Sequence, residues 1–202
     1  MGINFGTMGS SNNNGIVLNL EKGALLDLTK REPGLKNVIA GVGWDANTTV
    51  PAFDLDISAF MLDANMKIHA ASDIVFFNNK TAPGVTLSGD NRSGDGDGDD
   101  EQIVLNLDQI PANVQAVDFV VNIFDAQNRR QTFGMVKNSY IRLMNHDKND
   151  AEICRFCLKD EYGSSTAVVF ARLQRDGSEW NFKALGEGKV VKDLNDIAAL
   201  YM

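Results

Sequence analysis

The order of apolar and polar residues along the chain indicates a protein built mainly from short β-strands. From Ile16 onward, brief runs that are apolar or that alternate between apolar and polar residues recur, and turn-forming residues separate them. These runs predict strands over residues 16–20, 24–29, 37–44, 53–62, 73–78, 102–108, 116–125, 140–144, 152–158, 167–175 and 179–185. Because many short strands are typical of a sandwich, the predicted fold class is mainly all-β, a β-sandwich of two antiparallel or mixed sheets.

Three further segments add to this pattern. Residues 1–15 are rich in Gly, Ser and Asn without apolar periodicity, which predicts a disordered N-terminal arm before one domain over residues 16–202. The dipeptide Asp176-Gly177 predicts a type I′ turn between the last two strands. Helical spacing of apolar residues near the C-terminus predicts a short helix packed against the sandwich, with Val191, Leu194, Ala198 and Tyr201 on its apolar stripe.

Composition narrows the range of partners and locations. The chain has 202 residues and a net charge of −8, and its positive residues are scattered, so we expect no nucleic-acid partner. It contains neither an apolar run of about eighteen residues nor the apolar stretch of a secretion signal, which predicts a cytoplasmic protein without a transmembrane segment. Peripheral association with a membrane stays open. Cations are the natural counterpart of such a charge.

The two cysteines offer little chemistry. Cys154 and Cys157 stand three residues apart, and no second pair or neighbouring histidine cluster completes a zinc site. We interpret them as two residues on opposite faces of one strand, because side chains alternate along a strand.

The strongest chemical signal is the acidic segment GDNRSGDGDGDDE, residues 89–101. Its glycines allow positive φ and bring carbonyl oxygens inward, and its carboxylates suit Ca²⁺, which takes about six to eight oxygen ligands. The alternative is a solvated acidic linker, and composition alone leaves both open. In the EF-hand template Asp95 would take the first position, which puts Asp100 where glycine is required and Asn106 where the bidentate glutamate belongs. Any site here therefore needs ligands from elsewhere in the chain.

A second acidic segment, FDLDISAF, could supply those ligands. Strand alternation places Asp54, Asp56 and Ser58 on one face, and residues two apart on a strand lie roughly 6.5 Å apart. Both aspartates could then hold one cation or two adjacent cations, although a solvated outer face is the alternative. Asn78 and Asn79, after the run DIVFF, are weaker candidates, since such residues also form ordinary turns.

Enzyme motifs are missing from the chain. It contains no G-x-x-x-x-G-K-[ST], no G-x-S-x-G and no H-E-x-x-H, and its histidines, His69 and His146, stand in polar, turn-like settings. We therefore expect no enzymatic activity. The alternative is a metal-dependent enzyme that acts on a phosphorylated or otherwise anionic small molecule with Mg²⁺ or Mn²⁺ held by the carboxylates.

Taken in order, the motifs resemble those of the TerD-type tellurium-resistance and bacterial stress-protein family. The resemblance extends from about Leu18 to the C-terminus. It rests on LEKGALLDLTK, GVGWD (41–45), FDLDISAFML (53–62), DIVFFNN (73–79), the acidic segment (89–101), IPANVQAVDFVVNIFDA (110–126), FGMVKNSYIRLMN (133–145) and EWNFKALGEG (179–188).

This resemblance implies a β-sandwich that binds Ca²⁺, with one or two ions expected, and that takes part in resistance to tellurite and other stresses without being a catalyst. It also implies other proteins of a stress-response complex as partners. Carried onto this chain, the metal ligands are Asp54, Asp56, Asp90, Asn91, Asp97, Asp99, Asp100 and Glu101, to which we add Asn78 and Asn79. The resulting hypothesis is a calcium-dependent scaffold in which the metal joins the two acidic segments.

Overall fold

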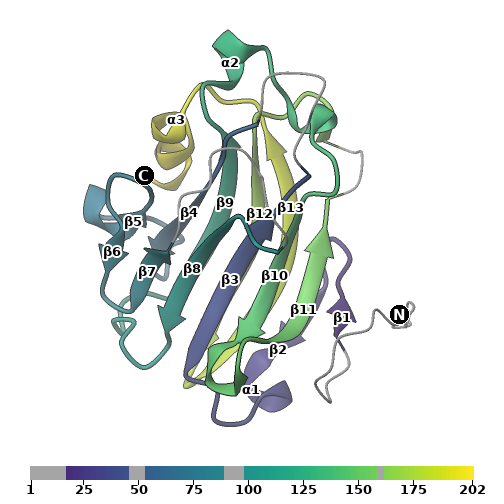
Figure 1. The fold of residues 1–202 in the computed structure, drawn as a ribbon. Helices are drawn as coiled ribbons and strands as arrows, with labels where there is room; N and C mark the ends of the chain where they lie inside the picture. Colours follow the sequence, from purple (N-terminus) through teal and green to yellow (C-terminus); the bar gives the residue numbers. More distant parts are fainter. Residues whose placement is uncertain (1–16, 46–52, 89–97, 159–161) are drawn as a thin grey trace.

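Two β-sheets lie face to face in the computed structural model (Figure 1), which describes residues 17–45, 53–88, 98–158 and 162–202. The predicted sandwich is confirmed. The first sheet contains, in spatial order, β1 (Leu18–Asn19), β11 (Ala151–Cys157), β10 (Tyr140–Asn145), β3 (Asn37–Gly43), β8 (Glu101–Asn106), β7 (Val85–Ser88) and β6 (Thr81–Ala82). The second contains β2 (Leu25–Asp27), β13 (Glu179–Lys189), β12 (Ala167–Asp176), β9 (Ala116–Ile123), β4 (Leu55–Leu62) and β5 (Ile74–Val75). The paired strands are antiparallel, except that β1 runs parallel to β11.

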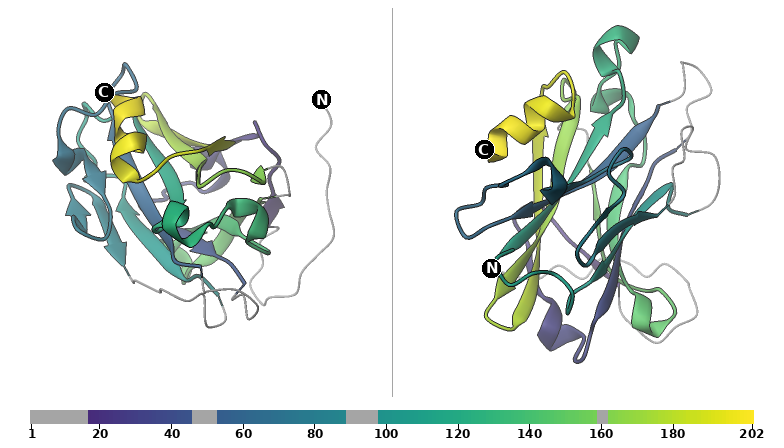
Figure 2. Two further views of the ribbon diagram at one scale, coloured as in Figure 1. Left: turned by 90° about the horizontal axis from the view of Figure 1, so that it is seen from above. Right: turned by 90° about the vertical axis from the view of Figure 1, so that its left-hand side faces the viewer.

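Short helices connect several of the strands, and one of them covers the six-stranded sheet. The α-helices are α1 (Leu28–Arg31), α2 (Ala126–Arg129) and α3 (Leu194–Ala198), and the 3₁₀ turns are η1 (Ala71–Asp73), η2 (Phe133–Met135), η3 (His146–Lys148) and η5 (Ala199–Tyr201). Helix α3 lies against the six-stranded sheet (Figure 2), which confirms the predicted C-terminal helix. Asp193 caps it by accepting from the backbone N–H groups of Asn195 and Asp196. None of the described helices is long and apolar enough to cross a membrane.

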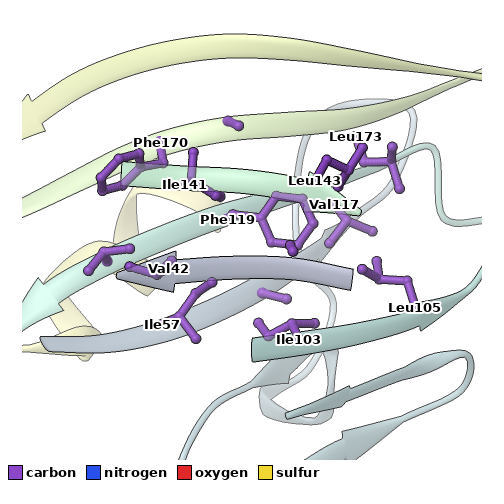
Figure 3. Packing of buried hydrophobic residues seen from close by; sticks show 14 of the residues in the cluster. Val42, Ile57, Ile103, Leu105, Val117, Phe119, Ile141, Leu143, Phe170 and Leu173 are labelled. Carbon is purple, nitrogen blue, oxygen red and sulfur yellow. The ribbon is translucent and has the colours of Figure 1, made fainter. Parts of the chain in front are cut away.

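The core fills the space between the inner faces of the two sheets (Figure 3). Ile57 of β4, Ile103 of β8, Ile141 of β10 and Phe170 of β12 each lose all of their exposed surface. Burying such a side chain contributes about 1.5–3 kcal/mol. These contacts fix the pairing of the sheets, because a slip of one residue would turn each strand's apolar set outward.

A second apolar cluster lies outside the six-stranded sheet, beneath α3 and η5. Phe60 of β4 stacks on Tyr201 with ring centroids 4.9 Å apart. The Tyr201 hydroxyl donates to Asp118, 2.8 Å away, and Arg172 donates to both oxygens of the same carboxylate. This cover keeps Phe60 and Leu62, on the outer face of β4, away from water. Asp56 lies on the same face and is only 8% exposed, so the alternative of a solvated face at Asp56 is wrong.

Local structure departs from the sequence prediction at several points. The strand expected over residues 24–29 ends at Asp27, which accepts a hydrogen bond from Lys30 N and caps α1. The strands β6 and β7 and the helix α2 were not predicted. The last hairpin turns at Gly177 and Ser178, and only Gly177 has positive φ. That pattern fits a type II′ turn, so the predicted type I′ turn is wrong.

The predicted faces of the cysteine strand are confirmed. Cys154 is buried, Cys157 is exposed, and neither of these two described cysteines forms a disulfide. Burial raises the pKa of the Cys154 thiol to about 12, which makes it a poor nucleophile. The predicted arm, residues 1–15, lies outside the described residues.

Candidate metal centre

Strand pairing brings the described end of the first acidic segment, residues 98–101, and the start of the second to one end of the sandwich. In the first sheet Val42, near the end of β3, pairs with Glu101 at the start of β8. In the second sheet Leu55, at the start of β4, pairs with Ile123 at the end of β9. A direct contact joins the two sheets here, because the backbone N–H of Ile57 donates to Glu101 Oε2 at 2.6 Å.

Glu101 is a buried carboxylate with a structural task. It is only 2% exposed, although glutamate is almost never fully buried without a partner. β5 pairs with β4 only at Ala59 and Phe60, so it does not reach the N–H of Ile57. The Glu101 carboxylate satisfies that N–H and ties β8 to β4. The contact holds the described end of the acidic segment, residues 98–101, beside β4, the strand that follows Asp54 and carries Asp56.

Asp56 of β4 and Asp54, which precedes the strand, have different surroundings. Asp56 is 8% exposed and lies on the outer face of the sheet, opposite Asn122 of β9. Asp54 precedes the strand, its backbone oxygen accepts from Phe124 N at 2.8 Å, and its carboxylate lies 3.9 Å from Arg129 Nη2. The predicted alternation is confirmed, since Leu55 and Ile57 point into the core. The sequence did not indicate Asn122 as a neighbour of Asp56, because only the register between β4 and β9 places the two residues side by side.

Asp100 closes the end of β3. Its backbone N–H donates to Val42 O at 2.8 Å, and its Oδ2 accepts from Trp44 N at 3.0 Å. Asp100 therefore joins the end of the acidic segment to the GWD motif.

Asp99 points away from the β4 aspartates, onto the outer face of the seven-stranded sheet. Its buried side chain accepts from Arg142 Nε at 2.7 Å, from the Tyr140 hydroxyl at 3.0 Å and from Gln102 Nε2 at 3.0 Å. A Cβ at position 41 would collide with this carboxylate, so Gly41 leaves the space it occupies. Both oxygens of Asp99 thus have protein donors, and its prediction as a metal ligand stays untested.

The Asp99 contact is one end of a longer ionic network. Arg142 also donates to Glu152 at 3.0 Å, and Arg155 binds the same carboxylate through two N–H groups while lying 4.0 Å from the Tyr140 ring centroid. Burial and the neighbouring Asp99 raise the pKa of Tyr140 to about 12. Sequence reasoning missed this network, and the only signal for it was the outward alternation of Tyr140 and Arg142 on a predicted strand.

The two asparagines form a turn. Phe76 and Asn79 exchange backbone hydrogen bonds, and the Asn79 amide donates to Ile74 O at 2.7 Å. Asn78 is exposed at the tip. This geometry accounts for Asn79 as a turn former, and it leaves Asn78 available to a ligand.

Three predicted ligands, Asp90, Asn91 and Asp97, lie outside the described residues. Within the described ranges, no three acidic, histidine or cysteine side chains are grouped closely enough to hold a metal ion. The donors that are described are all oxygen atoms, the ligand type that Ca²⁺ prefers. They fit the chemistry of a calcium site without completing its coordination.

Comparison with known proteins identifies the family. Residues 16–201 match the TerD domain family. The chain belongs to the TerD family. It is 47% identical over 174 residues to the tellurium resistance protein TerD of Serratia marcescens, covering 85% of this chain and 90% of that protein. It is 41% identical over 177 residues to general stress protein 16U of Bacillus subtilis, covering 86% of this chain and 91% of that protein.

Solved structures of the TerD type share the fold. A crystal structure of a homologue of telluride resistance protein (TerD) from Streptomyces coelicolor A3(2) matches with a TM-score of 0.68 at 24% identity. The match covers 84% of this chain and 99% of that one. The TerD assignment therefore places this chain among tellurium-resistance and stress-response proteins, as the motifs predicted.

Proposed function

We propose that this protein is a non-enzymatic, calcium-binding scaffold of a cytoplasmic stress response associated with tellurite resistance. The observation that carries the proposal is the contact between Glu101 and the Ile57 N–H, because it joins the two acidic segments across the two sheets. Residues of two segments that are distant in the chain would then act on the same cation. Neighbouring carboxylates repel one another, by about 1 kcal/mol in water and about 4 kcal/mol at an effective dielectric constant near 20.

We assign different tasks to the acidic residues. Asp56, on the strand that Glu101 contacts, and Asp54, just before that strand, are the described residues best placed as ligands. Asp90, Asn91 and Asp97 are the proposed donors from the other segment. Glu101 and Asp100 hold the segments together through the N–H groups of Ile57 and Trp44. Asp99, held by Arg142, Tyr140 and Gln102, anchors the end of the acidic segment to the sheet.

A bound Ca²⁺ would neutralise part of this negative charge and stabilise the arrangement. Binding to the folded state alone adds stability, about 2.7 kcal/mol when the free ion is about a hundred times Kd. The ordered end of the sandwich would then present a surface to other proteins of the stress-response complex. The metal thereby links ion binding to assembly.

The positions of the histidines support a non-enzymatic role. His69 follows the far end of β4, and His146 lies beside Asp147, whose carboxylate binds the first residues of β3. Both histidine side chains are exposed. Both lie at the end of the sandwich that is opposite to Asp54 and Asp56. A general base for metal-assisted hydrolysis would have to lie within hydrogen-bonding reach of the substrate.

A paired substitution tests the proposal. In the double variant Asp56→Asn with Asp100→Asn, we expect the melting temperature to stop rising with calcium, because one proposed ligand and the closure of β3 lose their charge. In the parent, about 2.7 kcal/mol corresponds to a rise of roughly 5–10 °C for a chain of this size. The control, Asp108→Asn with Asp176→Asn, removes the same charge from the other end and should keep the full rise.

An unchanged calcium response in the Asp56 and Asp100 double variant would contradict the proposed site. Melting in a chelator separates loss of binding from loss of fold, since the variant should then melt close to the parent. The non-enzymatic part is tested with a panel of phosphate esters in the presence of Mg²⁺ or Mn²⁺. Turnover that disappears in the same double variant would favour the metal-dependent enzyme instead.

A further inference from the structure

A cavity of about 410 Å³ lies at the end of the sandwich opposite the candidate metal centre. It is formed where β12 turns into β13, where β8 ends and where the chain leaves α1 for β3 (Figure 1). Leu35, Leu107, Ile110 and Trp180 give it apolar walls, and Arg175 and Ser178 add polar groups. Its volume is within the usual range for small-molecule sites, about 300–1,000 Å³.

Arg175 is the unusual residue of this cavity. Its guanidinium lies 4.3 Å from the Trp180 ring centroid and donates to the backbone oxygens of Val114 and Ile110, each at 3.1 Å. A guanidinium has five N–H donors, so these two contacts leave donors for another acceptor. The planar group is thus held rigidly at the wall of the cavity.

Arg175 differs from the other partly buried arginines in its electrostatic surroundings. Arg142, Arg155 and Arg172 each bind an aspartate or glutamate at 3.0 Å or less. Within the described residues, no carboxylate forms an ion pair with Arg175, and burial lowers the pKa of its guanidinium. A charge that is partly withdrawn from water without a counter-charge favours the binding of an anion.

The other charges around the cavity do not cancel this one. Lys36 and Asp108 line it as a pair, with Lys36 Nζ 3.1 Å from Asp108 Oδ2. The acidic residues of the hairpin, Asp176 and Glu179, act on Lys30, after the larger effect of Asp27 on that lysine. Among the three charged residues that line the cavity, Lys36 and Asp108 pair with each other, and Arg175 is the one for which the described residues show no ion pair.

We propose that this cavity binds a small organic anion, a carboxylate or phosphate monoester attached to an apolar body. The anionic group binds the Arg175 guanidinium, with the Ser178 hydroxyl at the rim, and the apolar body packs against Leu35, Leu107 and Trp180. Arg175 supplies planar, charge-assisted hydrogen bonds, which suit both carboxylates and phosphates. This site requires neither the acidic segments nor a metal, so it stands or falls separately from the proposed calcium function.

The experiment uses the two tryptophans of the chain, Trp44 and Trp180, as reporters. The full-length protein is labelled with 5-fluorotryptophan, its two ¹⁹F resonances are assigned with Trp44→Phe, and phenyl phosphate or benzoate is titrated. We expect the Trp180 resonance to shift saturably with a Kd of about 1 mM or tighter, while the Trp44 resonance stays in place. Benzyl alcohol and inorganic phosphate each lack half of the ligand and should bind at least about tenfold more weakly.

Three variants decide the role of the residues. Arg175→Met should weaken binding of phenyl phosphate at least about tenfold, because the charge-assisted hydrogen bonds are lost. Arg130→Met, which replaces an exposed arginine at the C-cap of α2, should leave the affinity unchanged. Ser178→Phe fills the mouth of the cavity from an exposed position and should block binding without unfolding the protein, so it decides the matter if Arg175→Met does not fold.

The opposite results would overturn the site. No saturable shift of Trp180 in the parent would show that the cavity binds neither anion. Equal affinity in folded Arg175→Met, or in folded Ser178→Phe, would show that binding takes place elsewhere. Benzyl alcohol binding as tightly as benzoate would remove the anion from the proposal, and inorganic phosphate binding as tightly as phenyl phosphate would remove the apolar body.

Discussion

Replacing Glu101 tests whether a buried carboxylate holds the two sheets together at the candidate metal centre. The Ile57 N–H donates to this carboxylate at 2.6 Å, and the residue is only 2% exposed. A hydrogen bond to a charged group contributes about 1.5–3 kcal/mol, and Glu101→Ala loses it and leaves the buried N–H without its acceptor. For a chain of this length we therefore expect the melting temperature to fall by roughly 3–12 °C.

The assay is thermal unfolding in a chelator, so that metal binding does not contribute. Glu101→Gln retains a neutral acceptor, worth about 0.5–1.5 kcal/mol, and should melt between Glu101→Ala and the parent. Glu187→Ala is the matched control, because this glutamate also lies on a strand but is half exposed, and its ion pair among the described residues is with Lys189. An exposed pair contributes about 0–1 kcal/mol. If Glu101→Ala melted like Glu187→Ala, the buried contact would not join the sheets as we argue.

Two further variants probe the contacts around the second cluster and the ionic network. Tyr201→Phe removes the hydroxyl that donates to Asp118 and should cost about 1–3 kcal/mol in chemical denaturation; an unchanged midpoint would show that the C-terminal turn is held by packing alone. For Glu152, burial alone would raise the carboxyl pKa, but the hydrogen bonds from Arg155 and Arg142 outweigh it and lower the pKa from 4.5. The stabilisation is then present above pH 4.5 and is lost as the pH falls through the lower folded value. Glu152→Gln should consequently destabilise the protein more at about pH 7 than at about pH 3, and an equal cost at both would contradict the ion pairs.

The strands could be predicted because each of them carries its own apolar pattern. Leu55, Ile57 and Ala59 alternate with Asp56 and Ser58, and this alternation alone indicates a strand with one face in a core. The short strands β6 and β7 carry too few residues for such a pattern, and helix α2, four residues long, begins at an aspartate in the left-handed region rather than at an ordinary cap. The turn type depends on which two residues occupy the loop. A shift of one residue in the strand pairing puts Gly177 and Ser178 there instead of Asp176 and Gly177, and this changes the turn from type I′ to type II′.

The candidate site could be predicted in part. Sequence motifs pointed to both acidic segments, but the roles within them depend on contacts between distant strands. Asp99 and Glu101 are two residues apart, yet one faces Arg142 outside the sheet and the other reaches Ile57 between the sheets. The local sequence around β8 does not indicate that β4 of the other sheet lies close enough to contact Glu101. Arg175 was missed for the same reason, since its lack of a counter-charge is visible only once its neighbours are placed.

The most direct test of the central claim is a calcium titration by calorimetry on chelator-stripped protein, with magnesium as the competitor. We expect saturable binding of one or two ions, only weakly opposed by magnesium, together with a rise in melting temperature that the Asp56 and Asp100 double variant lacks. If no calcium binding appeared, the two acidic segments would meet for structural reasons alone, and the calcium-dependent scaffold would have to be abandoned.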